Sequence, residues 1–553
     1  MVAATHPPDP DPDDRTNEPK AWLVNSLYKH RLDALGTPAF ILKNQLHLIG
    51  KEAEGRGDIA KTISMARGDP NYSSPALAQS VFAALSGRAQ LISELGIEAG
   101  AKAFETLWAL NDPTITGGRK GNNGDIVFQT TKRLIGDMVQ IGKEFGLSDE
   151  EVEYALYKQI LGEQYDDPKG LLMVRAILAQ YLNDEVFGLT GQAQVAANGI
   201  IITEGAGSAI GAFVAMCYGT GYLQPGDKVV LLSPLYEPYA VICANNGLDV
   251  LPLDCSGLTG QPSNAGRAWL ENQSFKLMII VDPSNPTGNT LNNASISWLA
   301  SLAERNEAVV LVDAVYTELL DEPTRRNTIM QALPAQSVIV WSFSKSHCQT
   351  GGRIGGIAYS ETAAAWLRQR LNINEEIDEA FCTAKCLAGA ALKHVSMLPT
   401  PQQIRAAVLA RCSGAHLSRW RAELQARYTL MHEELGLTVP QGVGWSVVPY
   451  YITFSLEDLI AKWASNEKSY MPLLISMRTG LITHDELLVQ LAKNGVELLY
   501  CARFFPGAEY EHRWFVRISV ANQHQPVLRE VARMMRKAFM QMSNMVAEEQ
   551  ANQ

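Results

Sequence analysis

The sequence predicts an α/β protein built on a mostly parallel β-sheet with helices on both faces. Four short runs of β-branched and other apolar residues occupy residues 228–233, 277–281, 308–312 and 337–342 without polar alternation. Continuous apolar runs of this length are typical of strands that are buried on both faces. Helix-compatible segments separate the runs, and polar, glycine-rich stretches follow them. This arrangement indicates a parallel sheet whose ligands bind beyond the carboxyl ends of its strands.

The N-terminal part is expected to hold a tail, a helix and a loop. Residues 1–20 contain five prolines and four aspartates without an apolar core, which predicts a disordered tail rather than a secretory signal. A helix is expected over residues 38–48, with Thr37 as its N-cap and Pro38 in its first turn. Residues 66–72 contain Gly, Pro and Asn and therefore predict an irregular loop.

The regions on either side of the predicted sheet are expected to be rich in helices. Residues 100–162 show a helical pattern in which Ser148 is a predicted N-cap. From about residue 400 onward, helices and strands mix and predict a second, smaller α+β domain. The last helix is expected to begin near Pro526. One apolar stripe along it, which predicts that it packs on a core, consists of Leu528, Val531, Met535, Phe539 and Met542.

The composition excludes several classes of protein. The 553 residues are 46% hydrophobic and 19% charged, which is typical of a globular protein with a large core. The formal net charge of −11 does not suit nucleic acids or anionic membranes, and no run of about 18 apolar residues supports a membrane span. The eight cysteines are sparse, and the loose spacing of Cys382, Cys386, Cys412 and His416 indicates free thiols rather than a metal site. We therefore expect a cytoplasmic protein without a metal.

Lys345 is the strongest candidate for a chemical role. It ends the motif Ser342-Phe-Ser-Lys, which follows the apolar run 337–342, and Gly-Gly-Arg353-Ile-Gly-Gly comes shortly after. A lysine at a strand end in a pocket can lose its proton through desolvation and form an imine. A serine–lysine hydrolase of the penicillin-binding type is excluded, because neither Ser-Asp-Asn nor Lys-Thr-Gly occurs in the chain.

Several further motifs stand at the predicted element boundaries. Asp-Pro-Ser-Asn285-Pro-Thr-Gly follows the run 277–281, and Asp313-Ala-Val-Tyr316 follows the run 308–312. Each motif alone is weak evidence, since it could be a turn, a cap or a structural ion pair. Together and in this order they indicate one site. In chain order, the motifs stand at Gly205-Ala206, Asn285, Asp313 with Tyr316, Lys345, and Arg517 inside an apolar strand.

This set of motifs resembles that of the pyridoxal-phosphate (PLP) enzymes of fold type I, the aspartate aminotransferase superfamily, from about residue 35 onward. The resemblance implies a three-layer large domain that binds pyridoxal 5′-phosphate, a smaller α+β domain, and an α-amino acid substrate that reacts through an external aldimine and a quinonoid or ketimine. We divide the chain into a disordered tail (1–25), an N-terminal segment contributing to the small domain and the substrate site (26–100), a helical insertion (101–165), the large PLP-binding domain (166–395) and the C-terminal small domain (396–553).

The resemblance implies a role for each residue around the cofactor ring. Lys345 would hold the cofactor as an internal aldimine and carry the Cα proton. Asp313 would pair with the pyridine nitrogen and keep it protonated, which makes the ring an electron sink. Asn285 and Tyr316 would form hydrogen bonds with the phenolic oxygen of the ring, and Tyr236 would stack on its face.

The anionic groups of the cofactor and the substrate are also implied to have partners. Backbone N–H groups of Gly205 and Ala206 at a helix N-terminus, together with Ser342 and Arg353, would bind the phosphate. Arg517 would bind the α-carboxylate of the substrate in a bidentate pair.

A narrower resemblance points to aspartate. The helix near residue 38 and the loop Arg67-Gly-Asp-Pro-Asn are similar to the N-terminal region of bacterial aspartate 4-decarboxylases. That resemblance implies that Arg67 contacts the distal carboxylate of the substrate, and that Tyr165 reaches the cofactor phosphate from a partner subunit. The chain would then be an aspartate 4-decarboxylase or aminotransferase that forms a homodimer or a larger homo-oligomer.

Departures from that family keep an alternative open. Asp69 replaces the usual asparagine, and the loop with Phe504, Phe505 and Tyr510 is bulkier and more aromatic. Aromatic residues in that loop would suit contact with a heteroaromatic substrate. The alternative is a specialised biosynthetic PLP enzyme that eliminates a Cβ or Cγ substituent and forms a carbon–carbon bond, for example on S-adenosylmethionine with a heteroaromatic co-substrate. A third hypothesis is a binding protein without catalysis, against which the complete cofactor set argues.

Overall fold

The computed structural model describes residues 39–110, 112, 122–164, 167–234, 236–255, 258–321, 329–373, 398–501, 504 and 514–551. The predicted tail at residues 1–25 lies outside the described residues, and so do Thr37, Pro38, Cys382 and Cys386. No helix in the described part of the chain has both the length and the apolar character needed to cross a lipid bilayer.

A seven-stranded sheet forms the centre of the fold, in the strand order β2-β8-β7-β6-β5-β3-β4. β8 runs antiparallel to both of its neighbours, β2 and β7, whereas all other neighbouring strands pair in parallel. The strands are β2 (Val195–Thr203), β3 (Lys228–Ser233), β4 (Asp249–Asp254), β5 (Leu277–Val281), β6 (Val309–Asp313), β7 (Ser337–Ser342) and β8 (Gly355–Ser360). The predicted α/β class with a mostly parallel sheet is therefore confirmed.

The four apolar runs are all strands of this sheet. β3, β5 and β7 have the predicted bounds, whereas β6 begins and ends one residue later than predicted. The shift arises because Asp313 still pairs with Val281 of β5 and with Val340 of β7. Asp313 is thus the last residue of its strand rather than the residue that follows it.

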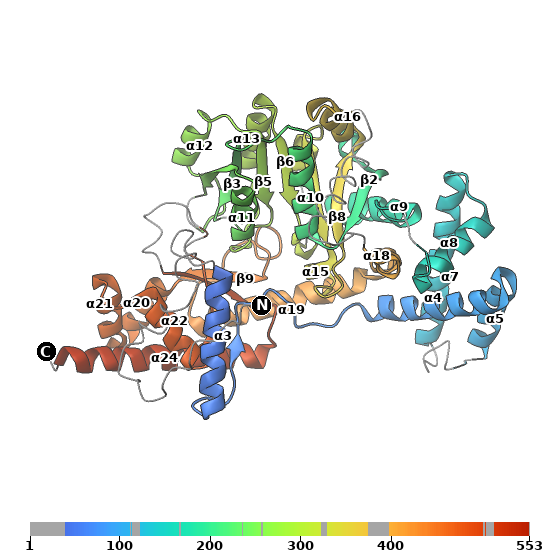
Figure 1. The fold of residues 1–553 in the computed structure, drawn as a ribbon. Coiled ribbons are helices and arrows are strands. Elements are labelled where there is room, and N and C mark those ends of the chain that lie inside the picture. Colours follow the sequence, from blue (N-terminus) through green and yellow to red (C-terminus); the bar gives the residue numbers. More distant parts are fainter. Residues whose placement is uncertain are drawn as a thin grey trace, which may run out of the picture.

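Helices cover both faces of the sheet and make a three-layer structure (Figure 1). Along β5, Met278 and Ile280 belong to one apolar core, whereas Leu277 and Ile279 belong to the other. This alternation explains the continuous apolar runs, because both sides of each strand are buried. The first core includes residues of α9 (Leu172–Tyr181), α13 (Asn293–Arg305) and α18 (Thr400–Cys412). The second includes residues of α10 (Ala206–Gly219), α11 (Glu237–Asn245) and α16 (Glu361–Arg370).

A further core lies below the sheet in Figure 1 and involves both ends of the described chain. A three-stranded antiparallel sheet in the order β11-β12-β9 (Leu499–Tyr500, Phe515–Ser519 and Tyr451–Ser455) packs there. A short parallel pair joins β1 (Ile63–Ser64) to β10 (Val496–Glu497). The helices of this part are α3 (Ala39–Arg56), α19 (Gly414–Leu435), α20 (Leu456–Asn466), α21 (Met471–Thr479), α22 (His484–Lys493) and α24 (Gln525–Ala551).

Two predictions concern the helices α3 and α24. The predicted stripe on the last helix is confirmed, because all five of its apolar residues are buried in this core. The first helix was predicted too short, since α3 continues to Arg56. Its buried residues Leu46, Ile49 and Ala53 extend the apolar face past residue 48.

Four helices form a group at the side of the molecule: α4 (Ala76–Leu95), α5 (Ile97–Ala109), α7 (Asn122–Glu144) and α8 (Asp149–Leu161) (Figure 1). The predicted N-cap is confirmed, since Ser148 and Glu151 form a capping box at the start of α8. The group shares an apolar core with one face of the large sheet. The domain boundaries at residues 25, 100, 165 and 395 stay predictions.

Candidate active site

A cavity of about 400 Å³ lies at the carboxyl ends of the parallel strands, where the large sheet meets the part of the molecule that contains α3, β9 and β12. A volume of this size is typical of small-molecule sites. Ten predicted site residues line it: Arg67, Ala206, Tyr236, Asn285, Asp313, Tyr316, Ser342, Lys345, Arg353 and Arg517. Gly205 lies directly behind the wall, and Tyr165 lies outside the described residues.

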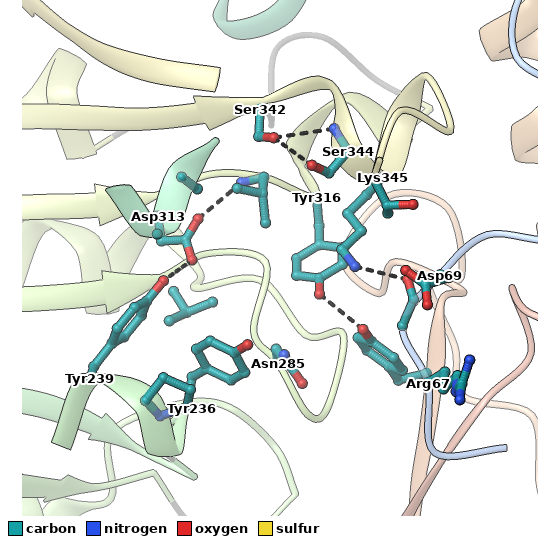
Figure 2. A pocket seen from close by; sticks show the side chains of 18 of the residues that line it. Arg67, Asp69, Tyr236, Tyr239, Asn285, Asp313, Tyr316, Ser342, Ser344 and Lys345 are labelled. Carbon is teal, nitrogen blue, oxygen red and sulfur yellow. Dashed lines mark hydrogen bonds between the residues drawn. The ribbon is translucent and has the colours of Figure 1, made fainter. Parts of the chain in front are cut away.

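The strand order explains why distant motifs meet. β7, β6 and β5 are neighbours, so Lys345, Asp313 and Asn285, which end or follow them, lie at the same edge of the sheet (Figure 2). Arg517 on β12 and Arg67, after β1, approach the cavity from the part of the molecule that contains the smaller sheets. The site is therefore built from both parts of the molecule.

Lys345 stands on a short helical turn, α15 (Phe343–Ser346). The Ser342 hydroxyl accepts from the Ser344 amide at 3.2 Å and donates to the Ile354 carbonyl at 2.9 Å, which holds the turn against the strand that follows it. The Lys345 ammonium donates to the carbonyl of Gly68 at 2.8 Å. The amine is thus aimed across the cavity at the loop that carries Arg67.

Gly68 is required by this close approach. A Cβ on Gly68 would lie 2.5 Å from the hydroxyl of Tyr451 and 3.0 Å from Nζ of Lys345. Since real Cβ atoms do not come so close to a buried side chain, any larger residue would displace one of these two groups. No role was assigned from sequence to Tyr451, which also lines the cavity.

Asp313 is buried at the floor of the site and accepts two hydrogen bonds. The Tyr239 hydroxyl donates to Oδ2, and the Val315 amide donates to Oδ1 at 3.3 Å (Figure 2). Burial raises the pKa of Asp313 to about 6, although both hydrogen bonds and the positive charge of Lys345 favour the carboxylate. A cation placed against this group, such as a protonated ring nitrogen, would remove the cost of its charge. Sequence reasoning missed Tyr239; its only signal is its position three residues after Tyr236, near the start of α11.

The start of α10 and the guanidinium of Arg353 lie together at the cavity wall. Gly205 is the N-cap, with φ of 82°, and Ala206 and Gly207 line the cavity. A Cβ on Gly205 would lie 2.8 Å from Nη2 of Arg353, so the glycine lets the guanidinium reach the helix N-terminus. A guanidinium beside free helix N–H groups suits a phosphate.

Arg517 is a fully buried cation at the cavity wall. It donates to Oδ1 of Asn285 at 2.7 Å and to the carbonyl of Ala66 at 2.8 Å. Its Nε has no hydrogen-bond partner, and no ion pair joins it to a carboxylate in the described part of the chain. A buried charge without a counterion is costly, so this arrangement calls for an anionic ligand. The side-chain oxygen of Asn285 accepts from Arg517, so its amide N–H groups can donate to another acceptor.

The outer end of the cavity is also positively charged. Arg67 and Lys43 of α3 line it, together with the carboxylate of Asp69. Burial, and the positive charges of Arg67 and Arg517, lower the pKa of Lys43, against the opposing effect of Glu497. Like charges held together in this way favour an anion between them.

Phe504, the residue of the predicted aromatic loop that the structure describes, does not line the cavity. Phe504 packs in a small apolar core with Leu499 and Phe515 and is absent from the cavity lining. The expectation that Phe504 contacts a substrate is therefore wrong, because its ring is buried against residues of β11 and β12. Phe505 and Tyr510 lie outside the described residues. Among the described residues, no group of three or more His, Cys, Asp or Glu side chains is placed to hold a metal ion.

Comparison with known proteins places the chain in a family. The family model named aminotransferase class I and II matches residues 155–534. A bifunctional aspartate aminotransferase and L-aspartate β-decarboxylase from a Pseudomonas species is 24% identical over 380 residues, which cover 61% of this chain and 70% of that protein. The aspartate aminotransferase of Thermotoga maritima is 29% identical over 227 residues, which cover 40% of this chain and 57% of that enzyme.

Solved structures show the same fold. A single mutant of the aspartate aminotransferase of Thermus thermophilus has a TM-score of 0.58 and 17% identity, covering 92% of this chain and 98% of that one. A methionine aminotransferase from Escherichia coli has the same TM-score and coverage at 16% identity. At such identities the likeness concerns the fold alone. The family model, in contrast, spans well over half of the sequence and includes the lysine, the aspartate and both residues of the buried guanidinium–amide pair, so the chain belongs to the aminotransferase class I and II family, whose members depend on pyridoxal phosphate.

Proposed function

We propose that this PLP-dependent enzyme acts on aspartate, as a β-decarboxylase or an aminotransferase. One observation supports this most strongly: Arg517 and Arg67 line the same cavity as Lys345, and in the described part of the chain neither forms an ion pair with a carboxylate. An amino dicarboxylic acid offers one carboxylate to each guanidinium. The printed name of the Pseudomonas relative, which joins both activities, agrees with this proposal.

The residues of the cavity fit PLP. When bound, PLP supplies an aldehyde that condenses with an amine and a ring that withdraws electrons from the bond being broken. In our proposal, the residues that hold its phosphate are Arg353, Ser342 and the amides at the start of α10. Asp313 would face the ring nitrogen, Tyr236 the ring face, and Tyr316 and Asn285 the phenolic oxygen.

The side chains of the protein would bind the substrate and move its proton. Arg517, fixed by its hydrogen bonds to Asn285 and Ala66, would bind the α-carboxylate in one orientation. The Lys345 amine, in the same cavity, would take up the Cα proton and return it later. Lys43 and Arg67 would attract the distal carboxylate.

The carboxylate of Asp69 offsets part of the positive charge of Lys43 and Arg67 in the cavity. Loss of a β-carboxylate as CO₂ converts an anion into a neutral molecule, so cations that bind the carboxylate too tightly oppose the step. A carboxylate at the same end of the cavity weakens that binding. Asp69 therefore suits decarboxylation better than transamination in our proposal.

Asp69 also favours the second candidate. A carboxylate at the cavity edge could face the sulfonium group of S-adenosylmethionine, from which the enzyme would expel methylthioadenosine by γ-elimination.

The first test is to incubate the purified holoenzyme with aspartate, with and without a 2-oxo acid, and to measure CO₂, alanine and oxaloacetate. The aspartate proposal fails if none forms while S-adenosylmethionine releases methylthioadenosine.

Replacing Asp69 by asparagine separates the two candidates. We expect D69N to lower the KM for aspartate roughly fivefold, because one like charge near the substrate is worth about 1 kcal/mol in water. Steady-state kinetics would measure the change, and Asp58→Asn, an exposed acid paired with Arg56, is the matched control. A higher KM for aspartate in D69N, or a lower one for a sulfonium substrate, would contradict the aspartate proposal.

Tyr239 is expected to control the charge of Asp313. In Tyr239→Phe the carboxylate loses its side-chain donor, so its pKa should rise further above about 6. Since hydrogen bonds to charged groups contribute about 1.5–3 kcal/mol, PLP should bind at least about 10-fold more weakly at neutral pH. Equilibrium binding of PLP across a pH series checks this. Tyr218→Phe, which removes a hydroxyl bonded to the Asn246 carbonyl, should bind like wild type. Equal affinity in both variants would show that Tyr239 has no such role.

We also propose that the enzyme works as a homodimer or a larger homo-oligomer. The support is the superfamily resemblance, in which the active site lies at a subunit interface and Tyr165 would reach the phosphate of the partner. Mixing Tyr165→Phe with Lys345→Ala subunits tests this proposal, because shared sites would restore part of the activity only if Tyr165 acts across the interface.

A further inference from the structure

Tyr451 is a buried phenol in the cavity to which the family resemblance gives no role. It is the first residue of β9, is 2% exposed and lines the cavity together with Lys345 and Arg517. Its hydroxyl lies 3.1 Å from the hydroxyl of Tyr316 (Figure 2). The position of a Cβ on Gly68 is 2.5 Å from this hydroxyl and 3.0 Å from Nζ of Lys345. The phenol and the amine therefore lie on the same side of Gly68, where any other residue would carry its Cβ.

Two cations flank the phenol. The Arg517 guanidinium carbon lies 4.0 Å from the centre of the Tyr451 ring, and Nζ of Lys345 lies on the same side of Gly68 as the Tyr451 hydroxyl. Neither cation forms an ion pair with a carboxylate among the described residues. The other titratable groups that face Tyr451 are Tyr316, its neighbour Tyr450 and the exposed Asp69. A phenolate at Tyr451 would thus be stabilised by the positive charges of both Arg517 and Lys345.

The balance of charge and burial differs between the paired phenols. Burial disfavours the charged form of Tyr451, but Lys345, Arg517 and the hydrogen bond from Tyr316 outweigh it and lower the pKa. For Tyr316, burial and the neighbouring Tyr451 raise the pKa well above its usual value. Tyr316 therefore keeps its proton and donates it in the hydrogen bond, and Tyr451 accepts.

We propose that Tyr451 is the proton acceptor that deprotonates Lys345 for its attack on the PLP aldehyde. The N–H bond of the ammonium breaks and its electron pair stays on Nζ, while a lone pair of the phenolate oxygen forms the new O–H bond. The products are a neutral amine, which is the nucleophilic form, and a neutral phenol. Before the transfer the phenolate and the ammonium form an ion pair, which offsets part of the positive charge of Lys345 and Arg517 in the cavity. This inference rests on the proposed role of Lys345.

The first experiment does not need PLP. We expect the full-length apoprotein to ionise one tyrosine below the usual pKa of about 10, seen as tyrosinate absorbance in the near ultraviolet. Tyr451→Phe should remove this step. Tyr428→Phe, which deletes a buried phenol outside the cavity whose pKa burial raises, should keep it. A wild-type protein without an early step, or a step that persists in Tyr451→Phe, overturns the proposal.

The second experiment measures how fast PLP becomes covalently bound. We expect Tyr451→Phe to form the visible absorbance band about 100-fold more slowly at neutral pH, and to regain speed as the pH rises, whereas Tyr428→Phe matches wild type. Gly68→Ala should also slow the reaction, because its Cβ would separate the phenol from the amine while both groups remain. Wild-type rates and pH dependence in both variants overturn the inference alone. A wild-type protein that forms no band would instead refute the proposed role of Lys345.

Discussion

The Lys345→Ala variant is expected to lose turnover of every amino acid substrate by at least about 10,000-fold. The lysine lines the cavity, and in our proposal its removal eliminates both the covalent attachment of PLP and the base for the Cα proton. The variant should still bind PLP noncovalently, because Asp313 and Arg353 remain in place. Visible absorption spectra and steady-state rates check both parts.

Two further variants control for charge and for general damage. Lys345→Arg keeps a cation within reach of the Gly68 carbonyl but cannot form an imine, so it should be as inactive as the alanine variant. Lys228→Ala removes a lysine at the opposite end of β3 and should keep wild-type activity. Full activity in either Lys345 variant would show that another amine carries the reaction.

The position of the site could be predicted from sequence because strands buried on both faces appear in it as continuous apolar runs. The alternation of residues such as Leu277 and Met278 between two cores makes every position apolar, so the run ends where burial ends. The first polar residues after these runs then fall at one edge of the sheet. For the same reason Asp313 was located to within one residue of its strand end.

The parts that could not be predicted depend on contacts between distant segments. Gly68, Lys345 and Tyr451 come from three distant segments, and the pairing of β1 with β10 and of β9 with β12 positions the segments of Gly68 and Tyr451. Strands of two to five residues carry too little periodicity to reveal such pairing. Phe504 illustrates the opposite error, since an aromatic residue in a loop was assigned to the site although its ring completes a core.

The cavity combines a buried guanidinium, a lysine and a carboxylate with a raised pKa before any ligand is bound. Folding therefore maintains charges that burial disfavours, and ligand binding relieves this cost. Arg517 calls for a carboxylate, the start of α10 for a phosphate, and Asp313 for a cation. PLP with an amino acid supplies all three, which is why we expect the apoprotein to be markedly less stable than the holoenzyme.

Asp313→Asn is expected to separate activity from stability. Turnover should fall by about 100- to 1,000-fold, because a neutral amide cannot hold a proton on the ring nitrogen by charge. The apoprotein, in contrast, should become more stable at neutral pH. Burial raises the pKa of Asp313 from 3.8 to about 6 in the folded state. A folded-state pKa above the unfolded one means that folding is favoured at low pH and that this advantage is lost as the pH rises through about 6.

The size of the expected gain in stability follows from the raised pKa of Asp313. Two pKa units correspond to about 3 kcal/mol, so the Asp313→Asn apoprotein should unfold with up to about 3 kcal/mol more free energy than wild type at pH near 7, and with nearly equal free energy at pH near 4. Tyr239 can still donate to the amide oxygen, which preserves packing. Urea unfolding of both apoproteins at the two pH values measures this, with exposed Asp249→Asn as control. Equal stability at neutral pH would mean that Asp313 already has a compensating cation without PLP, and retained turnover would mean that the ring nitrogen needs no charged partner.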